Sequence, residues 1–304
     1  MARMEVCAPA KINLFLELID RRDDGFHELE TVMLPIAMSD RLVFQTRTDG
    51  QIRLNAIPTR MNHPQTSGPS VFEIPLDQRN LVWQAITKLS ESAQRTLGVD
   101  IAIQKNIPSM AGLGGGSSDA ATTLQACNRL FKLGLDRQQL TKIANEIGSD
   151  VAYFLERGVA LCTGRGERVQ KLIDPAPQQW VVLMMPPAGL STAQVYQQSQ
   201  LPDQPKSSQT LLDGLRRNDF RKVANGLFNR LQTAAEKIQP WITKAKREFQ
   251  KLNCQAHQMT GSGSAYFGLY RNLQTANRSA RRLAARNPKA AVYCVRSLGI
   301  MNNA

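Results

Sequence analysis

The sequence predicts an α+β protein built from two domains, and three observations support this class. Apolar residues alternate at period two near the N-terminus, which indicates strands with one buried face. Apolar residues recur at spacings of three and four in segments such as residues 80–98 and 117–131, which indicates helices. After Gly158 the chain changes to short apolar runs followed by helical segments. We therefore expect a first domain over residues 1–160 and a second over residues 161–304.

Composition limits the classes of function. The 304 residues are 42% hydrophobic and 21% charged, as in a globular protein. No uninterrupted apolar run is long enough to span a bilayer, and charged residues interrupt the first twenty positions, so neither a membrane partner nor a secretory signal is expected. The five cysteines are odd in number and widely scattered, which fits a reducing compartment and predicts a cytoplasmic protein.

The net charge of +13 is concentrated in the last third of the chain. Residues 206–304 hold 18 Lys/Arg and 4 Asp/Glu, so the remainder is close to neutral. A basic region can serve nucleic acid, an acidic substrate or only solvation. Within it, residues 273–286 have the pattern of an amphipathic helix with arginines on its outer side. Without interleaved aromatic residues, a solvated face is favoured and no nucleic-acid partner is expected.

Several local signals define the elements of the first half. Alternation over residues 4–19 predicts a strand broken at Pro9, and an apolar run follows at residues 29–36. Asp49-Gly50 is a hairpin signal between two further strand candidates. Residues 57–75 carry four prolines and no periodicity, which predicts a long loop.

The second half contains further helix and strand signals. Asp136 with Gln139 three residues later resembles a capping box that begins a helix ending at Gly148. Helical patterns are expected over the ranges 211–215, 219–231 and 238–252, and strands over 159–163, 181–185 and 290–295. Met259 to Ala265 forms a second glycine-rich loop.

The most informative stretch is a first glycine-rich loop from Ile107 to Asp119. It contains four glycines, at positions 112, 114, 115 and 116, and it directly precedes a helical pattern. Glycine lets the backbone approach a ligand closely, and free N–H groups at a helix start favour an anion. Two other phosphate loops are excluded: no Gly-Lys-Ser/Thr ends the loop, and Ser117 replaces the third glycine of the dinucleotide fingerprint. The loop therefore predicts a nucleotide phosphate held by main-chain amides.

Single polar residues elsewhere are ambiguous when taken alone. Lys11 within an alternating strand is more often a solvent-facing lysine, Asp150 at a helix start is more often a cap, and His27 is more often structural. Phosphoryl transfer needs a phosphate cradle, a positive charge and a group that deprotonates the attacking hydroxyl. These residues could supply the last two requirements.

The order of four motifs decides between these interpretations. Pro9 to Leu14, the loop at 112–118, Gly148 to Val151, and Thr260 to Gly263 together resemble the GHMP small-molecule kinases. The resemblance extends from about Ala8 to Val295. It implies a two-domain GHMP kinase fold, with an N-terminal ribosomal-protein-S5-like ATP-binding domain and a C-terminal α/β sandwich domain.

Within the superfamily, the first motif together with Arg22 to His27 is similar to kinases of 4-diphosphocytidyl-2-C-methyl-D-erythritol. The resemblance implies that Asp150 is the general base and that Lys11 stabilises the transferring charge. It assigns the ATP phosphates to a loop of twelve residues: Pro108, Ser109, Met110, Ala111, Gly112, Leu113, Gly114, Gly115, Gly116, Ser117, Ser118 and Asp119. It assigns the adenosine pocket to Asn80, Leu81 and Lys105.

The same resemblance implies a site for the cytidine diphosphate part of a small-molecule substrate. His27 matches the histidine that binds the cytosine edge, Tyr196 stands where an aromatic ring stacks on the base, and Asn13 lies beside Lys11. Phe26 stands where tyrosine is common, which removes one hydroxyl but keeps a stacking face. Gly261 and Gly263 match the third motif.

The implied reaction is ATP-dependent phosphorylation of the 2-hydroxyl of this substrate, in the non-mevalonate route to isoprenoid precursors. Mg²⁺ is expected to accompany ATP, with Ser118 as a candidate ligand. A monomer or a weak homodimer is expected. Two alternatives stay open at this point: another GHMP kinase of homoserine or mevalonate type, and a nucleic-acid-binding module that uses the basic last third.

Overall fold

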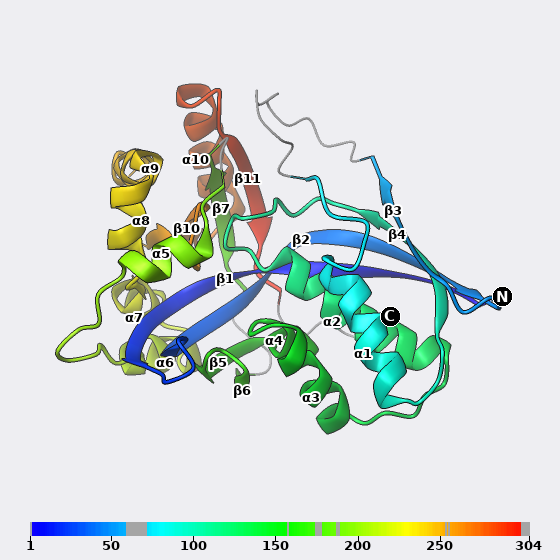
Figure 1. Cartoon of the computed structure of the whole chain (residues 1–304). Coiled ribbons are helices and arrows are strands. Elements are labelled where there is room, and N and C mark those ends of the chain that lie inside the picture. Colours follow the sequence, from blue (N-terminus) through cyan, green and yellow to red (C-terminus); the bar gives the residue numbers. More distant parts are fainter. Residues whose placement is uncertain are drawn as a thin grey trace.

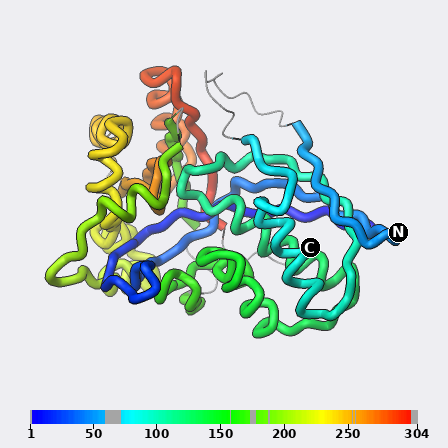
Figure 2. Tube along the Cα trace, viewed as in Figure 1, coloured from blue at the N-terminus to red at the C-terminus, as the bar shows by residue number. Residues whose placement is uncertain are grey.

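A computed structural model describes residues 2–58, 72–156, 158–173, 178–186, 189–252, 254 and 256–298. Most of the loop predicted over residues 57–75 lies outside these residues. The described chain forms two sheets with helices on their outer sides (Figure 1). The N-terminal strands, blue in Figure 2, run from the helices of the second half to those of the first half.

The first sheet is organised around two long antiparallel strands, β1 (Arg3–Arg21) and β2 (His27–Arg47). Its main path runs β3-β4-β2-β1-β8, and β5 pairs with β2 and β6. The shorter strands are β3 (Ile52–Ile57), β4 (Gly98–Gln104), β5 (Val159–Gly164), β6 (Arg168–Ile173) and β8 (Phe228–Asn229). The two long strands thereby carry residues of the first thirty positions across most of the molecule.

Two expectations for these strands were wrong. β1 is not broken at Pro9, because a register shift between Pro9 and Ala10 accommodates the proline within the pairing with β2. Asp49-Gly50 does not close a hairpin: β4 inserts between β2 and β3, pairing antiparallel with the first and parallel with the second. A local turn signal cannot reveal a strand that arrives fifty positions later.

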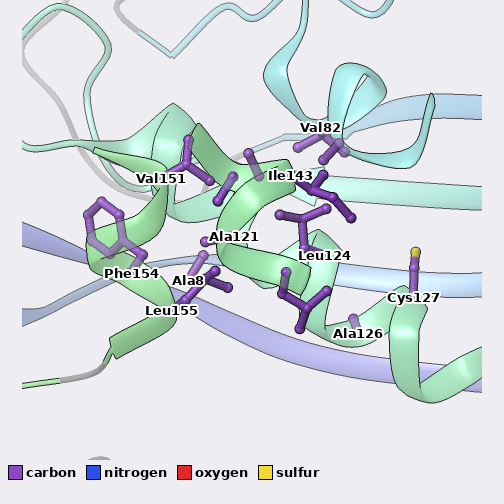
Figure 3. Close-up of a cluster of buried hydrophobic side chains, with 14 of the residues drawn as sticks. Ala8, Val82, Ala121, Leu124, Ala126, Cys127, Ile143, Val151, Phe154 and Leu155 are labelled. Atoms are coloured by element: carbon purple, nitrogen blue, oxygen red, sulfur yellow. The ribbon is translucent and has the colours of Figure 1, made fainter. Parts of the chain in front are cut away.

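Four helices cover one face of this sheet (Figure 1). They are α1 (Leu81–Ser92), α2 (Gly115–Leu130), α3 (Arg137–Ile147) and α4 (Val151–Glu156). The capping box predicted at Asp136 and Gln139 begins α3. Figure 3 shows how side chains such as Leu124 of α2, Val151 of α4 and Ala8 of β1 meet in one apolar cluster. This packing fixes the starts of α2 and α4, where the site lies.

The second sheet has the order β11-β7-β10-β9 and packs on the other face of the first. Its strands are β7 (Trp180–Met185), β9 (His257–Met259), β10 (Tyr266–Tyr270) and β11 (Ala291–Arg296). Its outer face packs against α8 (Gln232–Ile238), α9 (Pro240–Gln250) and α10 (Leu273–Arg286). Ile12 and Leu34 of the first sheet meet Leu183 and Phe267 of the second in a shared core.

The remaining helices are short: α5 (Thr192–Gln198), α6 (Gln209–Arg216) and α7 (Phe220–Gly226). The single helix expected over residues 219–231 was wrong. α7 ends at Gly226, and β8 follows it to pair with β1. A local helical period cannot anticipate this pairing across more than two hundred positions.

The first sheet extends past the predicted domain boundary at residue 160, which falls within β5. The boundary itself stays a prediction.

None of the described helices combines the length and the apolar character that a bilayer crossing requires. All five cysteines are free thiols, and burial raises the pKa of Cys127 to about 12.

Candidate active site

The first glycine loop connects β4 to α2, and its backbone conformation requires glycine at two positions. Gly112 has φ +73°, and a Cβ there would collide with the carbonyl oxygen of Thr260. Gly114, the N-cap of α2, has φ +71°, and a Cβ there would lie 2.9 Å from the Phe154 ring and 3.2 Å from Cε of Lys11. The loop is therefore packed closely at these positions, and its chain leads directly into the N-terminus of α2.

The second glycine loop supports the first from the other sheet. The amide of Ala265 donates to the carbonyl of Ala111 at 3.1 Å, and Gly261 lies so close that a Cβ would be 3.1 Å from the Gly112 oxygen. The side chain of Asn229 donates to the Gly261 carbonyl at 2.9 Å, which holds the second loop in turn. The two motifs that are far apart in the sequence thus form one structural unit.

Lys11 and Asp150 meet beside this unit. Their Nζ and Oδ2 atoms are 3.4 Å apart, and the Lys11 side chain is 4% exposed whereas that of Asp150 is 31% exposed. The Lys11 ammonium donates to Asn13 Oδ1 at 2.7 Å and to the Gly112 carbonyl at 3.0 Å. The backbone amide of Lys11 donates to the Leu113 carbonyl, so β1 is joined to the first glycine loop. The ammonium has three N–H donors; two bind the Asn13 and Gly112 oxygens, and the third is left for the Asp150 carboxylate.

Asn13 is the centre of a buried polar network. Its Nδ2 donates to Thr31 Oγ1 at 2.8 Å, and its backbone amide donates to Thr260 Oγ1 at 2.9 Å. Asn13, Thr31 and Thr260 are all buried. A satisfied network of this kind fixes the rotamer of Asn13, and through it the direction of the Lys11 ammonium.

Lys105 lies beneath the glycine loop in a buried ion cluster. Its ammonium is paired with Asp40 and, at 2.8 Å, with Asp119 Oδ2. Burial raises the pKa of Asp119 to about 7 in spite of Lys105, and the Asp40 charge contributes to the increase. In the described part of the chain, Asp119 Oδ1 and Ser118 Oγ have no hydrogen-bond partner. Lys105 therefore serves two carboxylates at the base of α2, and two buried polar atoms beside it are free for a further polar group.

Three rings lie at the other end of the site. The centroids of His27 and Tyr196 are 5.4 Å apart with the rings tilted by 38°. Phe26 is 50% exposed, which is unusual for a phenylalanine ring and leaves a face available for stacking. Burial, with the nearby charge of Arg21, lowers the pKa of His27 below 6.5. A neutral His27 presents one donor and one acceptor, which suits the edge of a base.

A cavity of about 1110 Å³ joins the two ends. Most of the predicted site residues line it, namely Lys11, Asn13, Phe26, His27, Leu81, Lys105, residues 108–117, Asp150, Tyr196 and Gly261. Four do not: Asn80, Ser118, Asp119 and Gly263. Asn80 caps α1 by accepting from the Val82 amide at 2.9 Å, and the other three lie behind the wall.

The charge of the cavity is strongly uneven. Lys11, Arg21, Lys105 and Arg165 line it, whereas Asp150 is the single carboxylate among the described residues of the wall. Lys11 and Lys105 are paired with carboxylates, whereas Arg21 and Arg165 have no ion pair among the described residues. These two arginines supply the positive charge that attracts polyanions. Arg165 and Thr31 were not predicted from the sequence, because an isolated arginine or threonine has no local signal. Thr260 was part of the third motif, but no role was assigned to it.

Comparisons with known proteins identify the family of this chain. Residues 80–158 match the family model described as GHMP kinases N terminal domain, and residues 211–289 match GHMP kinases C terminal. A protein of Bacillus velezensis called 4-diphosphocytidyl-2-C-methyl-D-erythritol kinase is 38% identical over 300 residues, covering 97% of each chain. The chain belongs to the 4-diphosphocytidyl-2-C-methyl-D-erythritol kinase family. The protein of the same name from Bacillus subtilis is 36% identical over 296 residues, covering 97% of each chain.

Solved structures show that this fold is shared within the family and beyond it. A crystal structure of a 4-(cytidine 5'-diphospho)-2C-methyl-D-erythritol kinase superposes with a TM-score of 0.76 at 31% identity, covering 97% of this chain and 99% of that one. A homoserine kinase from Cytophaga hutchinsonii reaches a TM-score of 0.74 at 18% identity, covering 99% and 96%. The two-domain GHMP kinase fold predicted from the motifs is confirmed.

Proposed function

We propose that this family member transfers the γ-phosphoryl group of ATP to the 2-hydroxyl of 4-diphosphocytidyl-2-C-methyl-D-erythritol, called the cytidyl substrate below. This is the reaction named for its relatives, and it belongs to the non-mevalonate route to isoprenoid precursors. The observation that carries the proposal is the Lys11–Asp150 pair, 3.4 Å apart, on the wall of a cavity that has a glycine loop and the His27–Tyr196 rings. A kinase of nucleotide-like alcohols needs these parts together.

ATP is the phosphate donor, as in GHMP kinases generally. We assign its phosphates to the amides of the glycine loop and the N-terminus of α2, where the helix dipole favours negative charge. Leu81 and Lys105 line the cavity beside the loop and are assigned to the adenosine side.

We also propose that Mg²⁺ accompanies ATP. Among the described residues no group of three metal-ligating side chains is found. Mg²⁺ that accompanies a nucleotide is typically held largely by phosphates and water. The hydroxyl of Ser118, the ligand expected from the sequence, is buried and does not line the cavity, so we assign the ion no protein ligand. The bound ion would neutralise charge on the phosphates.

The residues of the chain have separate roles in the transfer. Asp150 accepts the proton of the 2-hydroxyl as that oxygen attacks the γ-phosphorus. Lys11, directed by Asn13 and the Gly112 carbonyl, stabilises negative charge on the transferring group. His27 binds the cytosine edge, and Phe26 and Tyr196 provide ring faces for the base.

The test is a direct assay of the purified protein with ATP and Mg²⁺. We expect ADP release that depends on the cytidyl substrate, and a product whose new phosphate is on the 2-hydroxyl by ³¹P NMR. Homoserine and mevalonate are the matched acceptors, because kinases of both have this fold. ADP release with either of them, and none with the cytidyl substrate, contradicts the proposal. The cytoplasmic location and the monomeric or weakly dimeric state stay predictions from the sequence.

A further inference from the structure

The turn between β5 and β6, residues 164–167, runs past the proposed general base. The Gly166 amide donates to the Thr163 carbonyl at 3.1 Å, which closes the turn. A Cβ on Gly166 would lie 3.7 Å from Asp150 Oδ1. Gly166 therefore lies within contact distance of the Asp150 carboxylate, and Arg165 is the residue directly before it.

The side chain of Arg165 points from this turn to the base end of the cavity. Its guanidinium carbon lies 4.9 Å from the centroid of the Phe26 ring, and the half-buried side chain lines the cavity wall. Among the described residues it has no carboxylate within 4.0 Å; nearby Asp24 is already engaged by Arg22. A guanidinium stacked on a ring keeps its in-plane N–H donors for another partner.

A chain of side-chain contacts fixes the turn relative to Phe26. Glu28 accepts from the Gly164 amide through Oε1 and from Arg22 through Oε2, both at 3.1 Å. Arg22 is paired with Asp24, and Asp24 accepts from the Phe26 amide at 3.1 Å. The backbone of Phe26 and the turn that carries Arg165 are thus joined by one network of hydrogen bonds and ion pairs.

The chemistry of the substrate matches this arrangement. The cytidyl substrate has a base at one end, an alcohol at the other and a diphosphate between them. If the base lies at His27 and the alcohol at Asp150, the diphosphate passes the turn of residues 164–167. The planar fork of a guanidinium binds two phosphate oxygens at once, which a lysine ammonium does not.

We propose that Arg165 is a specificity residue that binds the diphosphate of the cytidyl substrate from the face of Phe26. The inference rests on the proposed function and deepens it. The arginine sets the spacing between the base site and Asp150, and it distinguishes a nucleoside diphosphate ester from a simple alcohol.

The test compares Arg165→Ala, Arg165→Lys and the wild-type protein. Steady-state assays give kcat and KM for the cytidyl substrate, and cytidine and CDP serve as inhibitors that compete with it at saturating ATP. Arg216→Ala is the matched control, because the Arg216 side chain of α6 is 54% exposed and does not line the cavity. Thermal unfolding of each variant shows whether the fold is kept.

For Arg165→Ala we expect KM for the cytidyl substrate and Ki for CDP to rise by about ten- to a hundredfold, the loss typical of a charged hydrogen-bonded pair. Ki for cytidine and KM for ATP should stay unchanged, and Arg165→Lys should recover part of the CDP affinity. Equal losses of affinity for cytidine and CDP would mean that Arg165 only supports the Phe26 ring. Unchanged affinity for CDP would mean that Arg165 does not contact the diphosphate. Either result overturns the inference. If the wild-type protein does not phosphorylate the cytidyl substrate, the proposed function fails instead.

Discussion

The two ends of the cavity are built in different ways. At the phosphate end, Lys11 and Asn13 are 3% and 1% exposed, and hydrogen bonds from β1, the first glycine loop and Thr260 fix them. At the base end, Phe26 is 50% exposed and lies in the short connection between β1 and β2. The groups for phosphoryl transfer are therefore preorganised by the core, whereas recognition of the base uses the exposed Phe26 ring together with the partly buried His27 and Tyr196.

This comparison predicts different kinetic consequences at the two ends. A change at the phosphate end removes interactions made in the transition state and lowers kcat. A change at the base end removes binding energy and raises KM for the cytidyl substrate.

The largest effect is expected for Asp150→Asn. The amide keeps the shape of the side chain but cannot accept the proton, so kcat should fall by about a hundred- to ten-thousandfold. The Kd for ATP, measured by calorimetry, should stay within about twofold because the glycine loop is untouched. Asp213→Asn in α6 is the control, since Asp213 is a partly exposed acid away from the cavity. Near-normal turnover by Asp150→Asn would remove the general-base assignment.

Lys11→Met should come next, with kcat lowered by about a hundred- to a thousandfold because the charge that stabilises the transferring group is lost. The thermal unfolding midpoint should change little, because methionine fills similar space and Thr260 still donates to Asn13 Oδ1 at 3.2 Å. A mutant that keeps its kcat would show that Lys11 is structural. A mutant that fails to fold would place the importance of Lys11 in the core rather than in the transfer.

Two glycines of the first glycine loop should differ in what an added Cβ does to the free energy of unfolding. Gly114→Ala places a Cβ at φ +71° against the Phe154 ring, so the free energy of unfolding should drop by about 1–3 kcal/mol. Gly116→Ala meets only Leu81 at 3.6 Å and should be neutral or stabilising by up to about 1 kcal/mol. Urea unfolding of both variants is the measurement. Equal effects would contradict the packed geometry of the loop.

The smallest effect is a pH dependence at the base end. Because burial and Arg21 lower the pKa of His27 below 6.5, the ring is neutral at pH 7 and gains a proton only in more acidic solution. KM for the cytidyl substrate should therefore be constant from pH 7 to 8 and rise several-fold below about pH 6. His27→Asn, which keeps a donor and an acceptor without titrating, should lose this rise. A rise of the same size in the variant would assign it to another group.

Local chemistry made part of the molecule predictable. The capping box of Asp136 and Gln139, the glycine loop before α2, and the motifs containing Lys11 and Asp150 all depend on residues near one another in sequence. Such signals act within a few positions, and the helices predicted from the first two, α3 and α2, are present. The 3.4 Å contact of Lys11 with Asp150 followed only from the resemblance, because no local rule brings positions 139 apart together.

Long-range pairing accounts for what could not be predicted. The insertion of β4 between β2 and β3 and the strand β8 after α7 both depend on partners far along the chain. The buried Glu17 carboxylate, which Arg230 binds through two nitrogens at 2.7 Å, joins β1 to the segment after β8, and nothing in either neighbourhood indicates it. The contacts of Arg165 with Phe26, and of Glu28 in β2 with the β5–β6 turn, likewise join residues far apart in the sequence and could not be predicted.

The most direct test of the central claim is a crystal structure with a non-hydrolysable ATP analogue and the cytidyl substrate bound together. We expect the triphosphate to lie against the amides of residues 112–117 and the cytosine to lie between the rings at His27. The 2-hydroxyl should be within hydrogen-bond reach of Asp150, about 2.6–3.2 Å. A triphosphate bound elsewhere, or a 2-hydroxyl out of reach of Asp150, would contradict this claim.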